Sequence, residues 1–572
     1  MTKLTNDPHD FVAQALEGYA AAQPDRVMAV PNGGIVRASR SPAGQVAVVM
    51  GGGAGHFPAF AGWVGAGFGH GAVCGNIFSS PSEDQILAVA HASDNGGGML
   101  FAPINYAGDM LHFGAAAAKL RAQGTDVRMR AITDDIVSAP SRDYLRRRGI
   151  AGAFIVLKIV GAAAERGDSL DEVERIMIKA NSATRSFGVA FGGCTLPGAS
   201  EPMFVIPPGR MAVGLGIHGE PGTGEVDRGS ADQVGDLIID GLFNERAPVA
   251  GGHVAVLVNG LGATKYDELS IIYRRVAERL AAVGLTPIAA VVGEQVTSLD
   301  MAGLSVSLTY LDQELEELWM APADVASFSR GVVGKHERRS LAPVPRAVQH
   351  QVEPGSQASQ MAAVELTLKI ELVKQVLTAH EARLGAIDAV AGDGDHGTGM
   401  VLGSAAGAAA AQELLTRQAG AGTLLSGAAR AWSKHAGGTS GALWGAGLEA
   451  AAAVLGDQDS PSSQMVAQAA GAFAEAIVRR GGAALGDKTM VDAVVPFAEG
   501  LAAGAAAGLG LTEAWRQAAQ DAQLAAAATA RFPSRRGRSR LHGERSVGTA
   551  DPGATSFALI VSSVLESCPS GK

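Results

Sequence analysis

Between positions 10 and 318, apolar residues form short continuous runs that are separated by stretches with helical spacing. The runs predict strands at 46–50, 99–104, 211–216, 254–258 and 287–292. Continuous apolar runs are typical of strands that are buried on both faces of an α/β sheet. Several of these runs end at glycine-rich turns, where α/β sheets usually bind ligands. The pattern therefore predicts an α/β domain with ligand-binding loops at its strand ends.

The pattern changes after a segment rich in proline and polar residues at 321–361. Beyond it the chain is alanine-rich, has few strand signals and shows helical spacing at 366–384, 465–479 and 512–528. No internal repeat relates the two halves. We expect an α/β domain at 7–330, a partly extended linker at 331–363 and a mostly helical domain at 364–566.

Composition narrows the class of protein. A chain of 572 residues is too long for one hydrophobic core, so two or more domains are expected. Its composition, with 47% hydrophobic and 18% charged residues, suits a soluble globular protein. The formal net charge of -10 argues against a nucleic-acid partner, so the basic run at 531–540 predicts a loop near phosphate or a solvated surface. Three dispersed cysteines without a CxxC pair argue against a zinc site or disulfides.

With no signal core or membrane span, we expect a cytoplasmic protein without a membrane partner.

Three polar side chains follow predicted strands in the first domain. His56 lies in a glycine-rich loop after 46–50, Asp109 follows 99–104, and His218 lies in a second glycine-rich loop after 211–216. Glycine loops let backbone N–H groups face a small polar ligand, and an aspartate at a strand end is placed to act as a general base. Each residue alone could also be structural, as a turn or helix cap. Their recurrence at strand ends favours one shared pocket.

The second domain contains a cluster of carboxylates, Asp388, Asp393 and Asp395, around a glycine turn. Three close carboxylates repel each other unless a cation neutralises them. Mg²⁺, a hard cation that binds carboxylate and phosphate oxygens, would do so. A solvated acidic turn is the alternative, and the EF-hand pattern is not met. The segment KHAGGTSGALWG at 434–445 suits phosphate at a helix N-terminus, although it is not a Walker A loop.

The motifs GGGAGHFPAFAGWVG, AVCGNIFSSPS, NYAGD, GLGIHGEPG, VNGLGAT and VTSLDMAG occur in this order over some 250 residues. Together they resemble the dihydroxyacetone (glycerone) kinase family, in its fused single-chain, ATP-dependent form. The resemblance implies an α/β ketose-binding domain made of two α/β subdomains. In that family a histidine holds the ketose as a covalent hemiaminal, and this histidine maps to His218. The substrate loop maps to Gly53, Ala54, Gly55 and His56, and the pocket aspartate to Asp109, so that His218, Asp109 and His56 are the implied catalytic residues.

Four further motifs, IDAVAGDGDHGTGM, KHAGGTSGALWG, GDKTMVDAVVP and GERSVGTADPGATS, resemble the nucleotide-binding domain of the same kinases. The resemblance implies an all-α antiparallel helical barrel and a homodimer. It also implies two Mg²⁺ ions that bridge the ATP phosphates, held by Asp388, Asp393 and Asp395. The implied nucleotide contacts are His396, Gly397, Thr398, Gly399, Thr439, Ser440, Gly481, Thr489, Met490, Asp551, Pro552 and Gly553.

The chain departs from the family pattern near the substrate loops, where polar residues are replaced by Ala54, Phe57, Phe60, Asn76 and Ile104. The implied activity is phosphorylation of a terminal hydroxyl of dihydroxyacetone or a related ketose. The alternative is a kinase for a four- or five-carbon ketose such as erythrulose or a branched ketose, and the apolar substitutions predict a higher kcat/KM for such a substrate. A flavin-nucleotide cyclising lyase activity and a non-catalytic ketose sensor are further alternatives.

Overall fold

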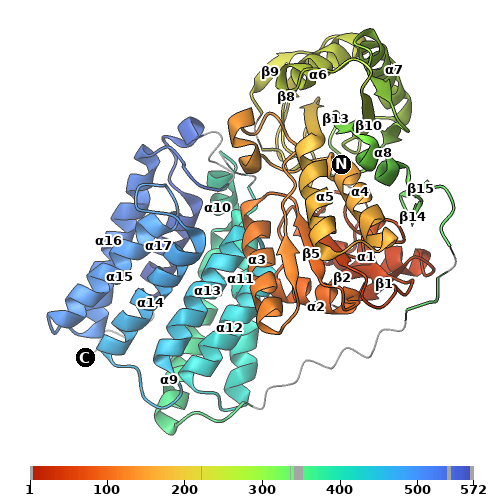
Figure 1. The fold of residues 1–572 in the computed structure, drawn as a ribbon. Coiled ribbons are helices and arrows are strands. Elements are labelled where there is room, and N and C mark those ends of the chain that lie inside the picture. Colours follow the sequence, from red (N-terminus) through yellow and green to blue (C-terminus); the bar gives the residue numbers. More distant parts are fainter. Residues whose placement is uncertain are drawn as a thin grey trace. The chain divides into compact units, whose positions relative to one another are not determined.

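The computed structural model describes residues 4–31, 33–220, 222–334, 336–339, 352–390, 392, 394–537 and 543–566. The chain divides into two compact units, Met1–Ala342 and Pro343–Lys572, and each is described by itself. Figure 1 shows that the first contains the sheets and the second is helical. The predicted order, an α/β domain followed by an all-helical domain, is confirmed.

The first sheet of unit 1 has six strands in the order β1-β2-β4-β3-β5-β6. Strands β3, β4, β5 and β6 run parallel, as continuous apolar runs predict. Val49 packs with helices α2 and α3 on one face, whereas its neighbour Val48 packs with α4 and α5 on the other. The strands are β1 Val27–Val30, β2 Gly34–Arg37, β3 Ala47–Ala54, β4 Gly71–Ile77, β5 Met99–Pro103 and β6 Val127–Met129. The helices are α1 Phe11–Ala22, α2 Glu83–Ser93, α3 Ala107–Ala122, α4 Ala153–Arg166 and α5 Leu170–Ala183.

The second sheet has seven strands in the order β11-β10-β13-β7-β8-β9, with β12 also pairing with β10. Helices α6 (Ala231–Glu245) and α7 (Tyr266–Ala282) bury apolar side chains against one of its faces. The strands are β7 Thr184–Ala190, β8 Arg210–Val213, β9 Gly224–Asp227, β10 His253–Gly260, β11 Thr286–Pro287, β12 Val291–Gly293 and β13 Gly303–Leu311. Helix α8 (Gln313–Met320) and the hairpin of β14 (Ala323–Val325) and β15 (Phe328–Arg330) complete the unit.

Two predicted strands differ from the structure at residues with positive φ. The run at 287–292 is split into β11 and β12, and Ala289 between them has φ 47°. The run at 211–216 ends early at Val213, because Gly214 has φ 72° and turns the chain out of the sheet. This second turn starts the loop that contains His218.

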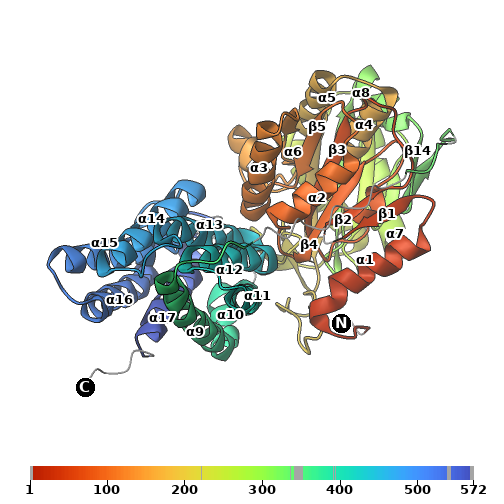
Figure 2. The same ribbon diagram turned by 90° about the horizontal axis from the view of Figure 1, so that it is seen from below.

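Unit 2 is a closed ring of antiparallel helices. Neighbours pack in chain order from α11 to α17, and α9 contacts both α11 and α17, so the ring closes (Figure 2). Alanine-rich faces let the helices approach closely around buried aromatic side chains. The helices are α9 Gln357–Ala379, α10 Glu381–Asp388, α11 His396–Thr416, α12 Ala421–Ala436, α13 Gly438–Leu455, α14 Ser463–Gly481, α15 Val491–Ala506, α16 Leu511–Ala528 and α17 Pro552–Glu566.

Helix α9 begins before the predicted domain boundary. The Ser356 hydroxyl accepts a hydrogen bond from the Ser359 amide and caps the helix. Residues 357–363, placed in the linker from their composition, are therefore helical. The predicted helix at 366–384 is divided at His380, where α9 ends and α10 starts. In the part of the chain that the structure describes, no helix has the length and apolar character needed to cross a membrane.

Candidate active site

The glycine-rich end of β3 and the turn after it are shaped around the aromatic ring of Phe78. A Cβ atom added at Gly55 would lie 2.8 Å from the Phe78 ring, and one added at Gly53 would lie 2.8 Å from the Phe78 carbonyl carbon. The Phe78 ring in turn stacks on the imidazole of His56, with ring centroids 5.1 Å apart. The glycines are therefore required for close packing around the ring that supports His56, a role that the sequence did not indicate.

This packing predicts the effect of a Gly55→Ala substitution. Gly55 has φ +95°, so the new side chain would be strained as well as overlapping with Phe78. We expect a loss of about 2 kcal/mol in the free energy of unfolding and a weaker ketose-dependent activity. Gly44→Ala is the matched control, since Gly44 has φ +82° but open space around the added Cβ. Denaturant unfolding should show a smaller loss of stability in Gly44→Ala, which has the backbone strain alone, and steady-state kinetics should show reduced activity only in Gly55→Ala. Equal activities would contradict this role of Gly55.

His56 and His218 meet in the interior of unit 1. Their Nε2 atoms lie 3.0 Å apart, and both residues are buried. The other ring nitrogens are held by different partners: Nδ1 of His56 lies 2.8 Å from the carbonyl oxygen of Thr297, and Nδ1 of His218 lies 2.9 Å from Oε1 of Glu220. The structure thus brings together the two histidines that the sequence placed at separate strand ends.

The hydrogen-bond partners of the two imidazole rings determine which ring nitrogens are protonated. A carbonyl oxygen only accepts, so Nδ1 of His56 donates to Thr297. An ionised Glu220 likewise accepts from Nδ1 of His218. If both imidazoles were neutral, two lone pairs would face each other across the 3.0 Å gap. The contact is therefore satisfied when the pair holds one additional proton between the Nε2 atoms.

Asp109 belongs to α3, the helix that follows β5 of the first sheet and begins beside the two histidines. It lies in the first turn of α3 and is buried. Tyr106, at the N-cap of the same helix, presents its ring edge-on to His218, with centroids 4.5 Å apart. The Asn105 amide fixes this turn by donating to the carbonyl oxygens of Leu145 and Arg147, at 3.0 and 2.8 Å. The start of α3 is thus anchored beside the histidines.

Three residues in this pocket were not predicted to have a role: Glu220, Tyr106 and Phe78. Glu220 could have been found from its position, because it lies two residues after His218 in the same glycine-rich motif. The aromatic rings of Tyr106 and Phe78 gave no such signal, since aromatic residues at strand ends are more often part of a core.

The positions that depart from the family pattern have different surroundings. Phe60 and Ile104 are both 2% exposed, belong to the main core and meet behind Gly52. Phe57 is 52% exposed and contacts the ring of Tyr19 edge-on at 5.4 Å. Ala54 is half-buried and Asn76 is exposed. Phe60 and Ile104 therefore form a layer behind the strand end rather than an exposed pocket wall.

This difference in burial predicts a larger loss of stability for one of two substitutions than for the other. Phe60→His would bury a polar ring and lose the edge-on contact with Trp63 at 5.6 Å, so we expect a loss of about 2–3 kcal/mol in the free energy of unfolding. Phe57→Glu changes a half-exposed side chain and should cost less than about 1 kcal/mol. Denaturant unfolding of both variants measures this. Equal effects would show that Phe60 does not pack as described.

In unit 2, the residues predicted to contact a nucleotide gather at one end of the helical ring. Because successive helices are antiparallel, α11, α13, α15 and α17 all begin at this end, and α14 ends there. Helix N-termini present free N–H groups and a positive dipole end to anions. The predicted residues at these ends are His396, Gly397, Thr398 and Gly399 on α11; Thr439 and Ser440 on α13; Gly481 on α14; Thr489 and Met490 before α15; and Asp551, Pro552 and Gly553 at α17.

His396 connects three of these helix starts. Its Nδ1 lies 3.2 Å from the Ser440 hydroxyl of α13, and its Nε2 lies 2.9 Å from the Ser556 hydroxyl of α17. Burial lowers the pKa of His396, so the ring is neutral and offers one donor and one acceptor to the two hydroxyls. The arrangement holds the starts of α11, α13 and α17 together.

Carboxyl groups converge beside these helix starts. Asp388 Oδ2 accepts a hydrogen bond from the Gly394 amide at 2.9 Å. Burial, and then the charge of Asp388, raises the pKa of Asp395 to about 8. Burial also raises the pKa of Asp551 to about 7, with a further contribution from Asp388. Such carboxyls favour a nearby cation, and their oxygen-only donors match Mg²⁺.

The third predicted metal ligand, Asp393, lies outside the described residues. Among the residues that are described, no three carboxylate, imidazole or thiol groups form a complete cation site. Asp388 and Asp395 are nevertheless close enough to interact electrostatically, because the charge of Asp388 contributes to the raised pKa of Asp395. The residues present therefore fit the predicted ion, whereas the full ligand set stays a prediction.

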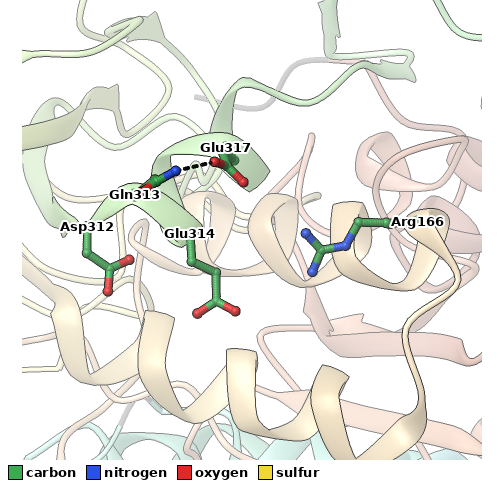
Figure 3. Close-up of a pocket in the computed structure, with 5 residues that line it drawn as sticks. All are labelled: Arg166, Asp312, Gln313, Glu314 and Glu317. Carbon is green, nitrogen blue, oxygen red and sulfur yellow. Dashed lines mark hydrogen bonds between the residues drawn. The ribbon is translucent and has the colours of Figure 1, made fainter.

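A surface pocket on unit 1 involves none of these residues. Figure 3 shows its lining side chains on α8, at the N-cap of α8 and at the end of α4. Two of them already form ion pairs with Lys179, which lies 2.5 Å from Asp312 and 2.6 Å from Glu314. The lining consists of Arg166, Asp312, Gln313, Glu314 and Glu317. It is an acidic, solvated surface without a nucleophile.

Comparison with known proteins relates both units to one family. Residues 17–327 match the Dak1 domain model and residues 390–566 match the DAK2 domain model. The chain is 50% identical to the L-erythrulose 1-kinase of Mycolicibacterium smegmatis, covering 99% of both chains. It is 48% identical to the L-erythrulose kinase of Pectobacterium atrosepticum, over 99% of this chain and 96% of that one.

A solved structure spans the same two units. The dihydroxyacetone kinase from C. freundii, in complex with AMP-PNP and Mg²⁺, shares 31% identity, covers 99% of this chain and 100% of its own, and has a TM-score of 0.52. The Dak1 match falls on the sheet-containing unit of this chain and the DAK2 match on its helical unit. The chain therefore belongs to the dihydroxyacetone kinase family, in its single-chain form with a Dak1 and a DAK2 domain.

Proposed function

We propose that this protein is an ATP- and Mg²⁺-dependent kinase that phosphorylates a terminal hydroxyl of a four-carbon ketose, with erythrulose as its preferred substrate. The kinase activity is supported by the relatives, which act on erythrulose at 50% and 48% identity. These relatives favour the erythrulose alternative over dihydroxyacetone itself. The structural observation that carries the proposal is the buried His218, whose Nε2 faces a second histidine at 3.0 Å.

The geometry supports covalent capture of a ketone. The Nε2 lone pair of His218 adds to the carbonyl carbon, the C=O π bond breaks, and the oxygen takes the proton held with His56. Polyols such as glycerol have no electrophilic carbon and are excluded by this step. The resulting hemiaminal fixes the substrate, and Asp109 at the start of α3 would accept the proton of the hydroxyl that attacks phosphorus.

The helical unit would supply the nucleotide site. The starts of α11, α13, α15 and α17 would bind phosphate oxygens, and Asp388, Asp393 and Asp395 would hold Mg²⁺. When bound, Mg²⁺ neutralises the charge that develops on the transferring phosphoryl group. The hydrogen bonds of His396 would keep three of the helix starts in position for that ligand.

A panel of ketoses with ATP tests the substrate. We expect L-erythrulose to exceed dihydroxyacetone in kcat/KM by about tenfold, because one added hydroxymethyl group is worth about 1–3 kcal/mol in a fitted pocket. D-erythrulose and a branched five-carbon ketose complete the series, and ADP release is the readout. Preference for dihydroxyacetone by tenfold or more would contradict the four-carbon assignment. Absence of ketose-dependent ADP release with every sugar would contradict the kinase itself.

The proposal also includes a homodimer, which the family resemblance implies. Each chain has a mass of 58.0 kDa, so light scattering after gel filtration should give about twice that value. A monomer mass at micromolar concentration would contradict it.

A further inference from the structure

Glu220 contacts His218 at two points. Its Oε1 atom lies 2.9 Å from Nδ1 of the ring, and its Oε2 atom accepts a hydrogen bond from the backbone N–H of His218 at 3.0 Å. Both side chains are 3% exposed. One carboxylate thus fixes the ring orientation, its tautomer and the backbone that carries it. A ring held in this way directs the lone pair of Nε2 toward His56.

A buried arginine lies beside Glu220. Nη1 of Arg148 lies 4.0 Å from Oε2 of Glu220 and makes no hydrogen bond. The other edge of the guanidinium is fixed: Nε and Nη2 donate to Asp135 Oδ2 at 3.0 and 2.8 Å, and Nη2 also donates to the Gly214 carbonyl at 3.2 Å. Arg148 therefore has a fixed position, with a free N–H edge beside the Glu220 carboxylate.

The backbone is closely packed against Glu220 and Arg148. A Cβ atom at Gly216 would lie 2.0 Å from Oε2 of Glu220 and 2.6 Å from Nη1 of Arg148. Burial alone would lower the pKa of Arg148, but the charges of Asp135 and Glu220 raise it above its ordinary value. The arginine is therefore a permanent cation beside Glu220. A fixed cation favours the ionised form of a neighbouring carboxylate.

We infer that Glu220 and Arg148 are positioning residues for covalent ketose capture: Glu220 keeps Nε2 of His218 unprotonated and stabilises the positive charge of the adduct, and Arg148 keeps Glu220 ionised and in place. This inference rests on the proposed function. It assigns the pair a role like that of the carboxylate that orients a catalytic histidine in hydrolases.

Charge balance explains why the carboxylate matters most after addition. Before addition, the two imidazoles share one extra proton. When Nε2 of His218 bonds to the carbonyl carbon, the oxygen takes that proton, His56 becomes neutral and the positive charge moves to the His218 ring. That ring faces Glu220 at 2.9 Å, so the charge is opposed by a buried carboxylate. Without Glu220 the adduct would be a buried cation with a weaker partner.

Glu220→Gln tests the first half of the inference. The amide can keep its oxygen toward Nδ1 only by pointing its NH₂ group at the His218 backbone N–H. In the other orientation it donates to Nδ1, which moves the ring proton to Nε2 and removes the nucleophilic lone pair. We expect kcat/KM for the ketose to fall about a hundredfold, with the KM for ATP unchanged. The alkaline limb of the pH profile should move to lower pH, because the imidazolium loses its carboxylate.

The adduct itself is followed by carbon-13 NMR with a ketose labelled at its carbonyl carbon. Wild-type protein should convert the ketone signal into that of a tetrahedral carbon, and Glu220→Gln should show at least tenfold weaker conversion. Equal conversion by the two proteins, or a uniformly lower profile without a pH shift, would overturn the inference while leaving the proposed function intact. Absence of an adduct in the wild type, despite ketose phosphorylation, would overturn covalent capture and the inference with it.

Arg148→Lys tests the second half, and its neighbour provides the control. Arg147 is also buried and paired with a carboxylate, since its Nη1 lies 2.9 Å from Oε1 of Glu245, but Glu245 is not a partner of His218. We expect both lysine variants to lose stability and only Arg148→Lys to show the shifted pH profile and the weaker adduct. If Arg148→Lys behaves like Arg147→Lys in both measurements, the arginine has only a structural role. This comparison also decides the matter if Glu220→Gln does not fold.

Discussion

Asp395→Asn is expected to lower ketose-dependent ATP consumption by about a thousandfold or more, while the ketose still forms its adduct on His218. The carboxyl is held among other acidic groups at the helix starts, and burial together with Asp388 raises its pKa to about 8. A cation bound at this carboxyl would relieve the repulsion that Asp388 contributes, so we expect Asp395 to be a Mg²⁺ ligand. Asparagine keeps the shape of the side chain but lacks the charge that Mg²⁺ needs.

The control for this variant lies at another helix start in the same unit. Asp457 accepts hydrogen bonds from the amide and the hydroxyl of Thr423, at 2.9 and 2.6 Å, near the start of α12. Asp457→Asn should lower stability but retain the Mg²⁺ dependence of the wild type. The measurements are Mg²⁺ titration of turnover and, separately, the adduct signal by carbon-13 NMR. Near-normal turnover of Asp395→Asn with Mg²⁺ would show that the metal assignment is wrong.

The sequence was informative about which segments form the site. Continuous apolar runs identified strands of the two sheets, and polar residues after three of these runs marked His56, Asp109 and His218. These signals are local, because a strand that ends in a glycine-rich loop exposes its end to ligand. The same holds for the helical unit, where the order of antiparallel helices places alternate N-termini at one end of the ring.

The contact between the histidines could not be derived from pattern alone. His56 follows β3 of the first sheet, whereas His218 follows β8 of the second. Their 3.0 Å approach depends on how the two sheets pack through a common core, and such packing is fixed by many distant side chains. The same reason applies to Glu220 and Arg148, whose partnership depends on the path of the loop after Gly214.

The departures from the family pattern show a second limit of sequence comparison. A change from polar to apolar residues suggested a new pocket wall, but the structure places Phe60 in the core and Phe57 against Tyr19 at the surface. Residue type alone does not distinguish a ligand contact from a packing layer, because both favour apolar side chains. If Phe57→Glu combined with Phe60→His leaves the preference among ketoses unchanged, selectivity is set elsewhere in the pocket.

His218→Ala is expected to abolish the ketose adduct and to lower kcat/KM for the ketose by about a thousandfold or more. The substitution removes the ring whose Nδ1 is held by Glu220 and whose Nε2 faces His56, so the substrate would be bound only by hydrogen bonds and contacts. Discrimination against glycerol-like polyols should be lost as well, because it depends on addition to a carbonyl carbon.

The matched control for His218→Ala is His253→Ala, which removes another histidine paired with a carboxylate, Glu316, at the surface of the same unit. That variant should retain the adduct and the wild-type ratio of ketose to polyol turnover. Native mass spectrometry with and without erythrulose, together with kinetics on erythrulose and glycerol, separates the outcomes. An adduct that persists in His218→Ala and disappears in His56→Ala would exchange the roles of the two histidines. In that case His56, whose Nδ1 donates to the Thr297 carbonyl, would be the nucleophile and Glu220 would orient the acid instead.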